Sequence, residues 1–241
     1  QTVNKSSNYS ISVLPADYSY NLSLLTNMNS TISQKTHETI TKNIDSVHTV
    51  CFVMSDGDNL QWLLNWFITD KRWFGNNNRG KLDIGWTISP ALSELAPTVM
   101  SKIYETSSNT TFGKDYFIAG PSGTGYIYPE TFKDLEIYTE QLNSYMQKSD
   151  LNIVNIIGNN FDDYYLYSFL EKPNINALFY YDFSNYSNHD GSIKFLNNKP
   201  IISARFNLWG GFNSAQSLSN KINNLPKNPY LESGYSLIPV H

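Results

Sequence analysis

The chain has 241 residues and a net charge of −4; 40% of its residues are hydrophobic and only 16% are charged. This hydrophobic content can build a sizeable core, whereas the acidic balance and the lack of a basic run predict no nucleic-acid partner. No run of about 20 apolar residues is present, so we expect no membrane span, and the single cysteine, Cys51, excludes an internal disulfide and a cysteine-based zinc site.

Short apolar runs alternate with helical patterns along the chain. The runs predict strands at residues 10–14, 49–54, 82–88, 115–120, 152–158, 176–183, 200–206 and 235–240. The patterns between them predict helices at residues 89–107, 128–148, 162–172 and 214–225. The strand runs are nearly all apolar, which is typical of parallel strands covered on both faces. Cys51 lies in such a run and is expected to be buried.

Eight strands separated by helices predict an α/β fold. We expect an irregular or incomplete (β/α)8-like (TIM-type) barrel, with an open doubly wound parallel sheet as the alternative. Residues 1–241 are predicted to form a single barrel-like domain, in which residues 1–14 are a linker or the first strand. The chain begins with Gln1 and ends in the apolar run SLIPVH, so we expect it to be a fragment of a longer multidomain protein.

Carboxylates follow several predicted strands, at the sheet edge where α/β enzymes carry their sites. Hydrolysis of a glycosidic bond uses one carboxylic acid to protonate the leaving oxygen and a second carboxylate as nucleophile or base. Asp56 and Asp58 are predicted to be active-site carboxylates, and either Asp163 or Asp182 is predicted to supply the second member of the pair.

The same residues have structural interpretations. Asp-Gly and Asp-Asn are frequent in turns, and Asp58 or Asn59 could cap a helix that begins at Leu60. Asp163 follows another aspartate, a pattern typical of a helix N-terminus. Asp182 differs, because a carboxylate that closes an apolar aromatic run is costly to bury without a partner.

Aromatic residues make up 15% of the chain, and the flat apolar faces and polar tips of tyrosine and tryptophan suit sugar rings. The residues predicted to bind substrate lie near the ends of the same strands: Asn59, Trp62, Trp86, Tyr126, Tyr128, Asn160, Arg205, Trp209 and His241.

The stretch GTGYIYP, residues 123–129, lies between a predicted strand and a predicted helix. Gly123 and Gly125 allow positive φ or the close approach of a ligand to the backbone. Tyr126 and Tyr128 are two residues apart and point the same way if the segment is extended. They are predicted to form a sugar platform or, alternatively, to pack the loop onto the rim of the fold. Pro129 is expected to begin the helix.

GTGYIYP resembles, at every fixed position, the signature of the GxGYxYP family of inferred glycoside hydrolases. Four further stretches resemble the C-terminal domain of that family: PADYSYNLSLL, VCFVMSDGDNLQW, GWTISP and SGYSLIPVH. The resemblance extends over residues 15–241. It implies a bacterial, extracellular or surface-attached protein that acts on glycans, with a missing N-terminal domain as a partner, and it assigns no catalytic residues.

We therefore expect a glycoside hydrolase that acts on a poly- or oligosaccharide without a cofactor. Two alternatives stay open. One is a metal-dependent carbohydrate deacetylase or esterase, in which Asp56, Asp58 and His241 ligate a divalent ion, although the four histidines are scattered and no HExxH motif is present. The other is a non-catalytic glycan-binding module.

Overall fold

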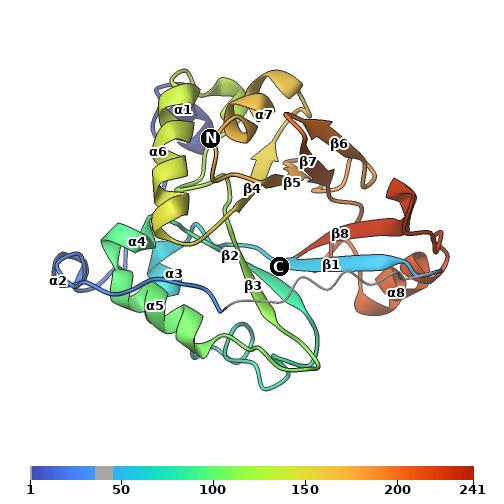
Figure 1. Cartoon of the computed structure of the whole chain (residues 1–241), viewed down its shortest axis with the longest axis horizontal. Helices are drawn as coiled ribbons and strands as arrows, with labels where there is room; N and C mark the ends of the chain where they lie inside the picture. Colours follow the sequence, from blue (N-terminus) through green and yellow to red (C-terminus); the bar gives the residue numbers. More distant parts are fainter. Residues whose placement is uncertain (1, 36–45) are drawn as a thin grey trace.

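The structure, a computed structural model, describes residues 2–35 and 46–241. In this part of the chain eight strands form one sheet in the order β6-β7-β5-β4-β3-β2-β1-β8 (Figure 1). Neighbouring strands are parallel except in the β6–β7 hairpin. The strands are β1 (Thr49–Met54), β2 (Ile84–Ile88), β3 (Asp115–Ala119), β4 (Ile153–Gly158), β5 (Ala177–Asp182), β6 (Ile193–Leu196), β7 (Lys199–Ser203) and β8 (Tyr235–Val240).

Helices connect most of the strands. The α-helices are α1 (Thr2–Ser7), α2 (Leu22–Leu25), α3 (Leu60–Asn65), α4 (Leu92–Leu95), α5 (Pro97–Thr106), α6 (Leu135–Lys148), α7 (Asp163–Leu170) and α8 (Ala215–Asn223). Two 3-10 turns, η1 (Pro129–Thr131) and η2 (Glu232–Gly234), precede α6 and β8. None of the described helices combines the length and the apolar character needed to cross a membrane.

Seven of the eight predicted strands are confirmed, and β1 and β8 have the predicted bounds. The strand predicted at residues 10–14 is wrong, because there Val13 forms only an isolated antiparallel bridge with Tyr126. Strand β6 was not predicted. It pairs with β7 through a two-residue turn in which Asn197 and Asn198 both have positive φ, a conformation that asparagine tolerates.

Two predicted helices differ from the structure. The helix predicted over residues 89–107 is divided into α4 and α5 at Ala96, whose backbone is not helical. The helix predicted from residue 128 begins only at Leu135, because Pro129 begins the short 3-10 turn η1 instead.

The sheet has an apolar core on each face, as its nearly all-apolar strands predicted. Alternate residues of a strand point to opposite faces. On β4, Val154 and Ile156 join the large cluster that packs against α3 to α7, whereas Ile157 joins a smaller cluster made mainly of strand residues. Figure 1 shows α3, α4 and α5 grouped beside β2 and β3, and α6 and α7 grouped beside β4 and β5.

The ladder of strands is open, with β6 and β8 at its two ends, so the predicted (β/α)8-like barrel is not confirmed. Two isolated parallel bridges, Ala204–Leu237 and Leu208–Val240, nevertheless place the chain that follows β7 beside β8. The smaller cluster also joins Val53 of β1 to residues of β3, β4, β5 and β8. The sheet must therefore curve strongly around this cluster. Cys51, which was predicted to be buried, is exposed on β1.

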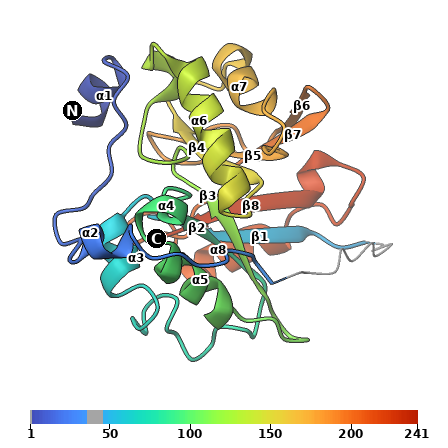
Figure 2. The same ribbon diagram turned by 60° about the vertical axis from the view of Figure 1, so that its left-hand side comes forward.

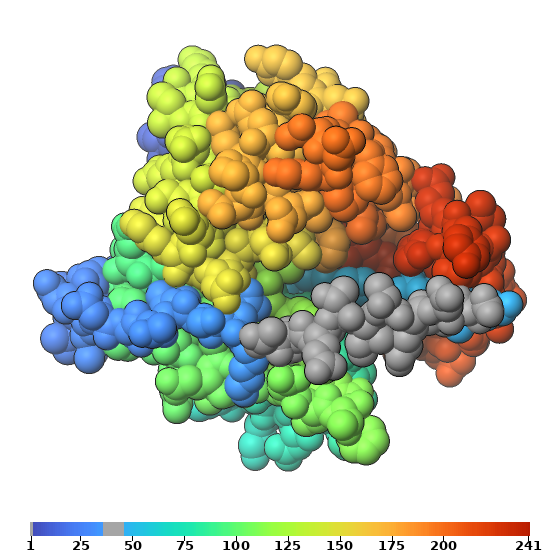
Figure 3. Space-filling model, viewed as in Figure 1, coloured from blue at the N-terminus to red at the C-terminus, as the bar shows by residue number. Residues whose placement is uncertain are grey.

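The N-terminal segment crosses the outside of the sheet and its helices (Figure 2). After α2 it runs on to Gln34, whose backbone N–H donates a hydrogen bond to Asp150 Oδ2 (2.8 Å), just after α6. In Figure 3 this segment, in blue, lies across the front of the molecule below α6.

Replacement of Gly123 by alanine is expected to destabilise the fold by about 1–3 kcal/mol. Gly123 has φ +118°, and a Cβ atom there would lie 2.7 Å from Leu142 Cδ2 of α6. Gly210→Ala is the matched control, because no atom lies within 4 Å of the added methyl group. Urea denaturation of both variants measures the difference, and equal free energies of unfolding would contradict the prediction.

Candidate active site

The loop after β1 presents two aspartates on either side of a glycine that touches β2. The Gly57 N–H donates to Thr87 Oγ1 (2.9 Å), and a Cβ atom at Gly57 would lie 2.1 Å from the Thr87 carbonyl carbon. Only glycine fits there. Asp56 has φ +72°, a left-handed conformation that aspartate adopts more readily than most residues.

The loop also forms the turn and the helix cap that the sequence suggested as structural interpretations. The Asn59 N–H donates to the Asp56 carbonyl oxygen (3.0 Å). Asn59 Oδ1 accepts from the Trp62 N–H (3.1 Å), and α3 begins at Leu60. The turn fixes both aspartates relative to α3, so the structural interpretation is compatible with a functional one.

Asp58 is a buried carboxyl group with only 8% of its surface exposed. Burial, and secondarily the negative charge of Asp56, raises the pKa of Asp58 from 3.8 to about 7. A carboxyl group of this kind holds its proton at pH values where an ordinary aspartate is ionised.

His241, the residue after β8, pairs with Asp56. Its Nδ1 lies 3.1 Å from Asp56 Oδ2 and 3.0 Å from Ser55 Oγ. The hydrogen bond to Asp56 raises the pKa of His241, and partial burial opposes this effect. The pair joins the carboxyl ends of β1 and β8.

An aromatic wall continues from His241. The Trp209 ring lies 4.1 Å from the His241 ring, centre to centre, and 5.0 Å from the ring of Tyr186. Burial and then the charges of Asp56 and Asp58 raise the pKa of Tyr186 to about 12. Tyr186 is thus a neutral phenol that faces both aspartates.

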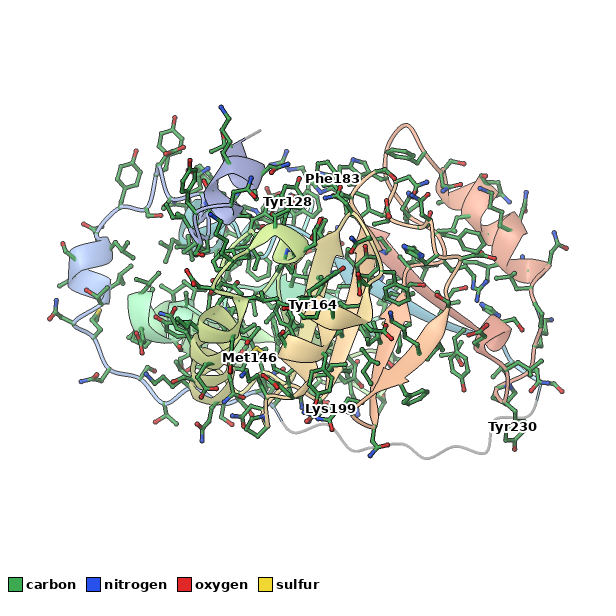
Figure 4. The ribbon with its side chains drawn as sticks, turned by 90° about the horizontal axis from the view of Figure 1, so that it is seen from above. Tyr128, Met146, Tyr164, Phe183, Lys199 and Tyr230 are labelled. Atoms are coloured by element: carbon green, nitrogen blue, oxygen red, sulfur yellow. The ribbon has the colours of Figure 1, made fainter. Side chains whose placement is uncertain are left out.

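Tyr126 and Tyr128 form a second aromatic group, in which Tyr126 lies near Asp58 and Tyr186. Their ring centres are 5.7 Å apart, and the Tyr128 ring packs edge-on against Phe183 at 5.1 Å (Figure 4). The pKa of Tyr126 is raised above its ordinary value by burial, then by its hydrogen bond with Tyr128, and to a smaller extent by other charges that include Asp58. Both phenols remain protonated at neutral pH and can donate hydrogen bonds.

The N-terminal segment holds the loop that carries these two tyrosines. The backbones of Val13 and Tyr126 exchange two hydrogen bonds (3.1 and 2.8 Å), and the Tyr128 N–H donates to Ser7 Oγ (2.9 Å). Gly125 lies against this segment and Gly123 against α6, so both glycines are packed by protein.

Two of the predicted carboxylates are engaged elsewhere. Asp182 Oδ1 accepts hydrogen bonds from the N–H and hydroxyl of Ser184 (3.0 and 2.6 Å) and from the Asn188 amide (2.9 Å), and thereby fixes the loop after β5. Asp163 is the first residue of α7 and forms an ion pair with Lys194. It lines a different cavity, between α6 and α7.

Four of the residues predicted to bind substrate do not join the group around the aspartates. Three lie elsewhere, and one lies in a neighbouring cavity. Trp86 is 3% exposed, lies in the large core cluster and donates its indole N–H to Asp115 (2.8 Å). The Arg205 Nε donates to the Tyr235 carbonyl oxygen (2.9 Å) at the start of β8. Asn160 lines the α6–α7 cavity, and Trp62 lines a cavity beside Asp56.

The structure therefore brings together Asp56, Asp58, Tyr126, Tyr128, Trp209 and His241 from the predicted set. It adds Tyr186 and Phe183, which the sequence analysis did not select. The sequence could have indicated Tyr186 as a site residue, because it is an aromatic residue in a polar loop that follows a strand.

Within residues 2–35 and 46–241, no three His, Cys, Asp or Glu side chains are grouped so that they could hold a metal ion.

Comparisons with known proteins find a matching family and a similar solved structure. A sequence model described as "GxGYxYP putative glycoside hydrolase C-terminal domain" matches residues 46–241. A crystal structure of "a putative hydrolase from Bacteroides thetaiotaomicron VPI-5482" superposes on the whole chain with a TM-score of 0.85 and 34% sequence identity. The chain spans 48% of that protein's length. A search of curated proteins finds no match.

Asp58→Asn is expected to stabilise the protein at alkaline pH. The pKa of Asp58 is higher in the folded than in the unfolded chain, so the stability of the wild type falls as pH rises from about 4 to about 7. An asparagine does not titrate. We expect the variant to gain on the order of 4 kcal/mol relative to wild type by about pH 8. Denaturation at several pH values measures this gain, with the exposed Asp134→Asn as control, and a pH-independent difference would contradict it.

Asp56→Asn is expected to lower the pKa of His241, because the hydrogen bond to Asp56 is the main cause of its elevation. NMR titration of the imidazole resonances measures the shift. His48, which precedes β1 at the opposite end of that strand, is the internal control. An unchanged His241 titration would show that the pair is not formed in solution.

Proposed function

The chain belongs to the GxGYxYP family, and we propose that it hydrolyses a glycosidic bond of a poly- or oligosaccharide with Asp58 and Asp56 as its two carboxylates. The observation that carries the proposal is the buried, proton-holding Asp58 directly beside a second carboxylate. Glycoside hydrolysis requires this combination of an acid that is still protonated near neutral pH and a nearby carboxylate.

Asp58 is the general acid in this proposal. With a pKa of about 7 it can protonate the leaving oxygen at neutral pH, which an ordinary aspartate cannot do. Its proton is then transferred to the glycosidic oxygen as the bond to the anomeric carbon breaks.

Asp56 is the second carboxylate, which acts as nucleophile or as the base that activates water. It is more exposed than Asp58 and is therefore more accessible to the sugar or to water. His241 touches Asp56 and orients it, and so acts as a positioning residue.

The aromatic residues around the aspartates bind the sugar. The Trp209 ring offers an apolar face, and the phenols of Tyr126, Tyr128 and Tyr186 offer hydrogen-bond donors to hydroxyl groups. On the family resemblance we place this activity outside a bacterial cell or on its surface, with a further N-terminal domain in the complete protein.

Asp58→Asn is expected to reduce kcat/KM by roughly 100-fold or more, and to remove the loss of activity that occurs as pH rises through about 7. Reducing-end release from plant, host and bacterial glycans measures the rate. Asp134→Asn, which changes an exposed carboxylate at the N-cap of α6, is the control.

Two outcomes would contradict the proposal. Activity that disappears in EDTA would indicate metal-dependent chemistry. Glycan binding without release of reducing ends, by a folded protein, would indicate a binding module.

A further inference from the structure

A cavity of about 540 Å³ adjoins the two aspartates and shares Asp56 with them. This volume lies within the range of about 300–1,000 Å³ that is usual for small-molecule sites. Trp62, Trp66 and Trp73 line it. With Trp209, four of the five tryptophans of the chain therefore lie in or beside the active site.

Core packing does not explain all three tryptophans of this cavity. Trp62 packs edge-on against Phe67 (4.9 Å) and against Trp73 (5.5 Å), so the core holds these two rings in place. Trp66, which follows α3, is 54% exposed. A large apolar ring left open at a cavity wall is characteristic of a binding surface.

Planar polar groups lie among these rings. Asn59, Gln61 and Asp70 line the cavity, and amide and carboxylate groups are suited to pairs of sugar hydroxyls. Arg72, the one cation among the described residues of the cavity wall, is paired with Asp70 through two nitrogens (Nε–Oδ1 3.0 Å, Nη2–Oδ2 2.6 Å). Because these charges offset each other and Asp56 is acidic, the wall favours a neutral ligand over an anionic one.

The cavity and the active site are continuous. Asp56 belongs to both, and the Trp73 ring lies 6.3 Å from the ring of His241. A sugar bound at Asp58 and Asp56 would therefore have its neighbour in the chain beside Trp73 and Trp66.

We propose that this cavity is a second sugar subsite, and that the substrate is a neutral oligosaccharide or polysaccharide of at least two sugars. Trp66 and Trp73 contact the apolar face of the second sugar, and Asn59 and Gln61 bind its hydroxyls. This inference rests on the proposed function for its account of which bond is cleaved, but the binding of the second sugar can be measured without hydrolysis.

The test is calorimetric titration of the Asp58→Asn chain with cello-, malto-, xylo- and manno-oligosaccharides of increasing length. Affinity should rise by roughly 10-fold or more from the monosaccharide to the longer members of one series. Adding Trp66→Ala should abolish this gain, and Trp66→Phe should restore part of it. Phe112→Ala, which removes an aromatic ring that is 83% exposed in a distant loop, should leave the gain unchanged.

The outcomes separate this inference from the proposed function. If the wild type hydrolyses the substrate, but Trp66→Ala leaves the affinity for longer oligosaccharides unchanged, the subsite alone would be overturned. Chain-length-dependent binding that requires Trp66, without hydrolysis by the wild type, would overturn the hydrolase proposal alone. A folded protein that binds no member of the panel, or prefers acidic oligosaccharides, would overturn the subsite.

Discussion

The contact between Gly57, in the loop after β1, and the backbone of β2 is the constraint on which the candidate site depends. No side chain fits between Gly57 and Thr87, so the loop must turn there, and it does so with Asp56 in a left-handed conformation. The turn sends one aspartate into the protein and leaves the other half-open to solvent. The two carboxylates, although only two residues apart, therefore differ in burial. Because desolvation raises the pKa of Asp58, only this one is suited to hold a proton near neutral pH.

The curvature of the sheet brings further residues next to the two aspartates. Asp56 can meet His241 only because β8 lies beside β1, although the two strands are almost 200 residues apart in the chain. Trp209 reaches the same place because the chain after β7 forms bridges with β8. Parallel strands direct their carboxyl ends to one edge, and curvature converts that edge into a wall that faces the two aspartates from several sides.

The strands could be predicted because each is a short, almost wholly apolar run. The same property explains why some side chains were assigned to the wrong environment. In a strand covered on both faces, apolar character does not reveal which face a side chain occupies, so Trp86 could not be assigned to the core from the sequence. Tyr126 and Tyr128 could be paired, because their spacing of two fixes a common direction in an extended segment. Tyr186 depends on the path of an irregular loop, which no periodicity encodes. Strand β6 has only four residues, and Lys194 interrupts its apolar run, so it is difficult to distinguish from such a loop, although the Asn197–Asn198 turn marks it.

The N-terminal segment lies outside the region that the family model matches, yet it helps to shape the candidate site. The part that matches the family begins at residue 46, yet the loop bearing the family's signature tyrosines is hydrogen-bonded to Ser7 and Val13. The region matched by the family model thus excludes the segment that holds these two tyrosines in place. Relatives whose N-terminal segments differ in these two contacts could hold identical tyrosines at a different angle to the aspartates. Variation in substrate preference within the family could therefore originate outside the region by which its members are identified.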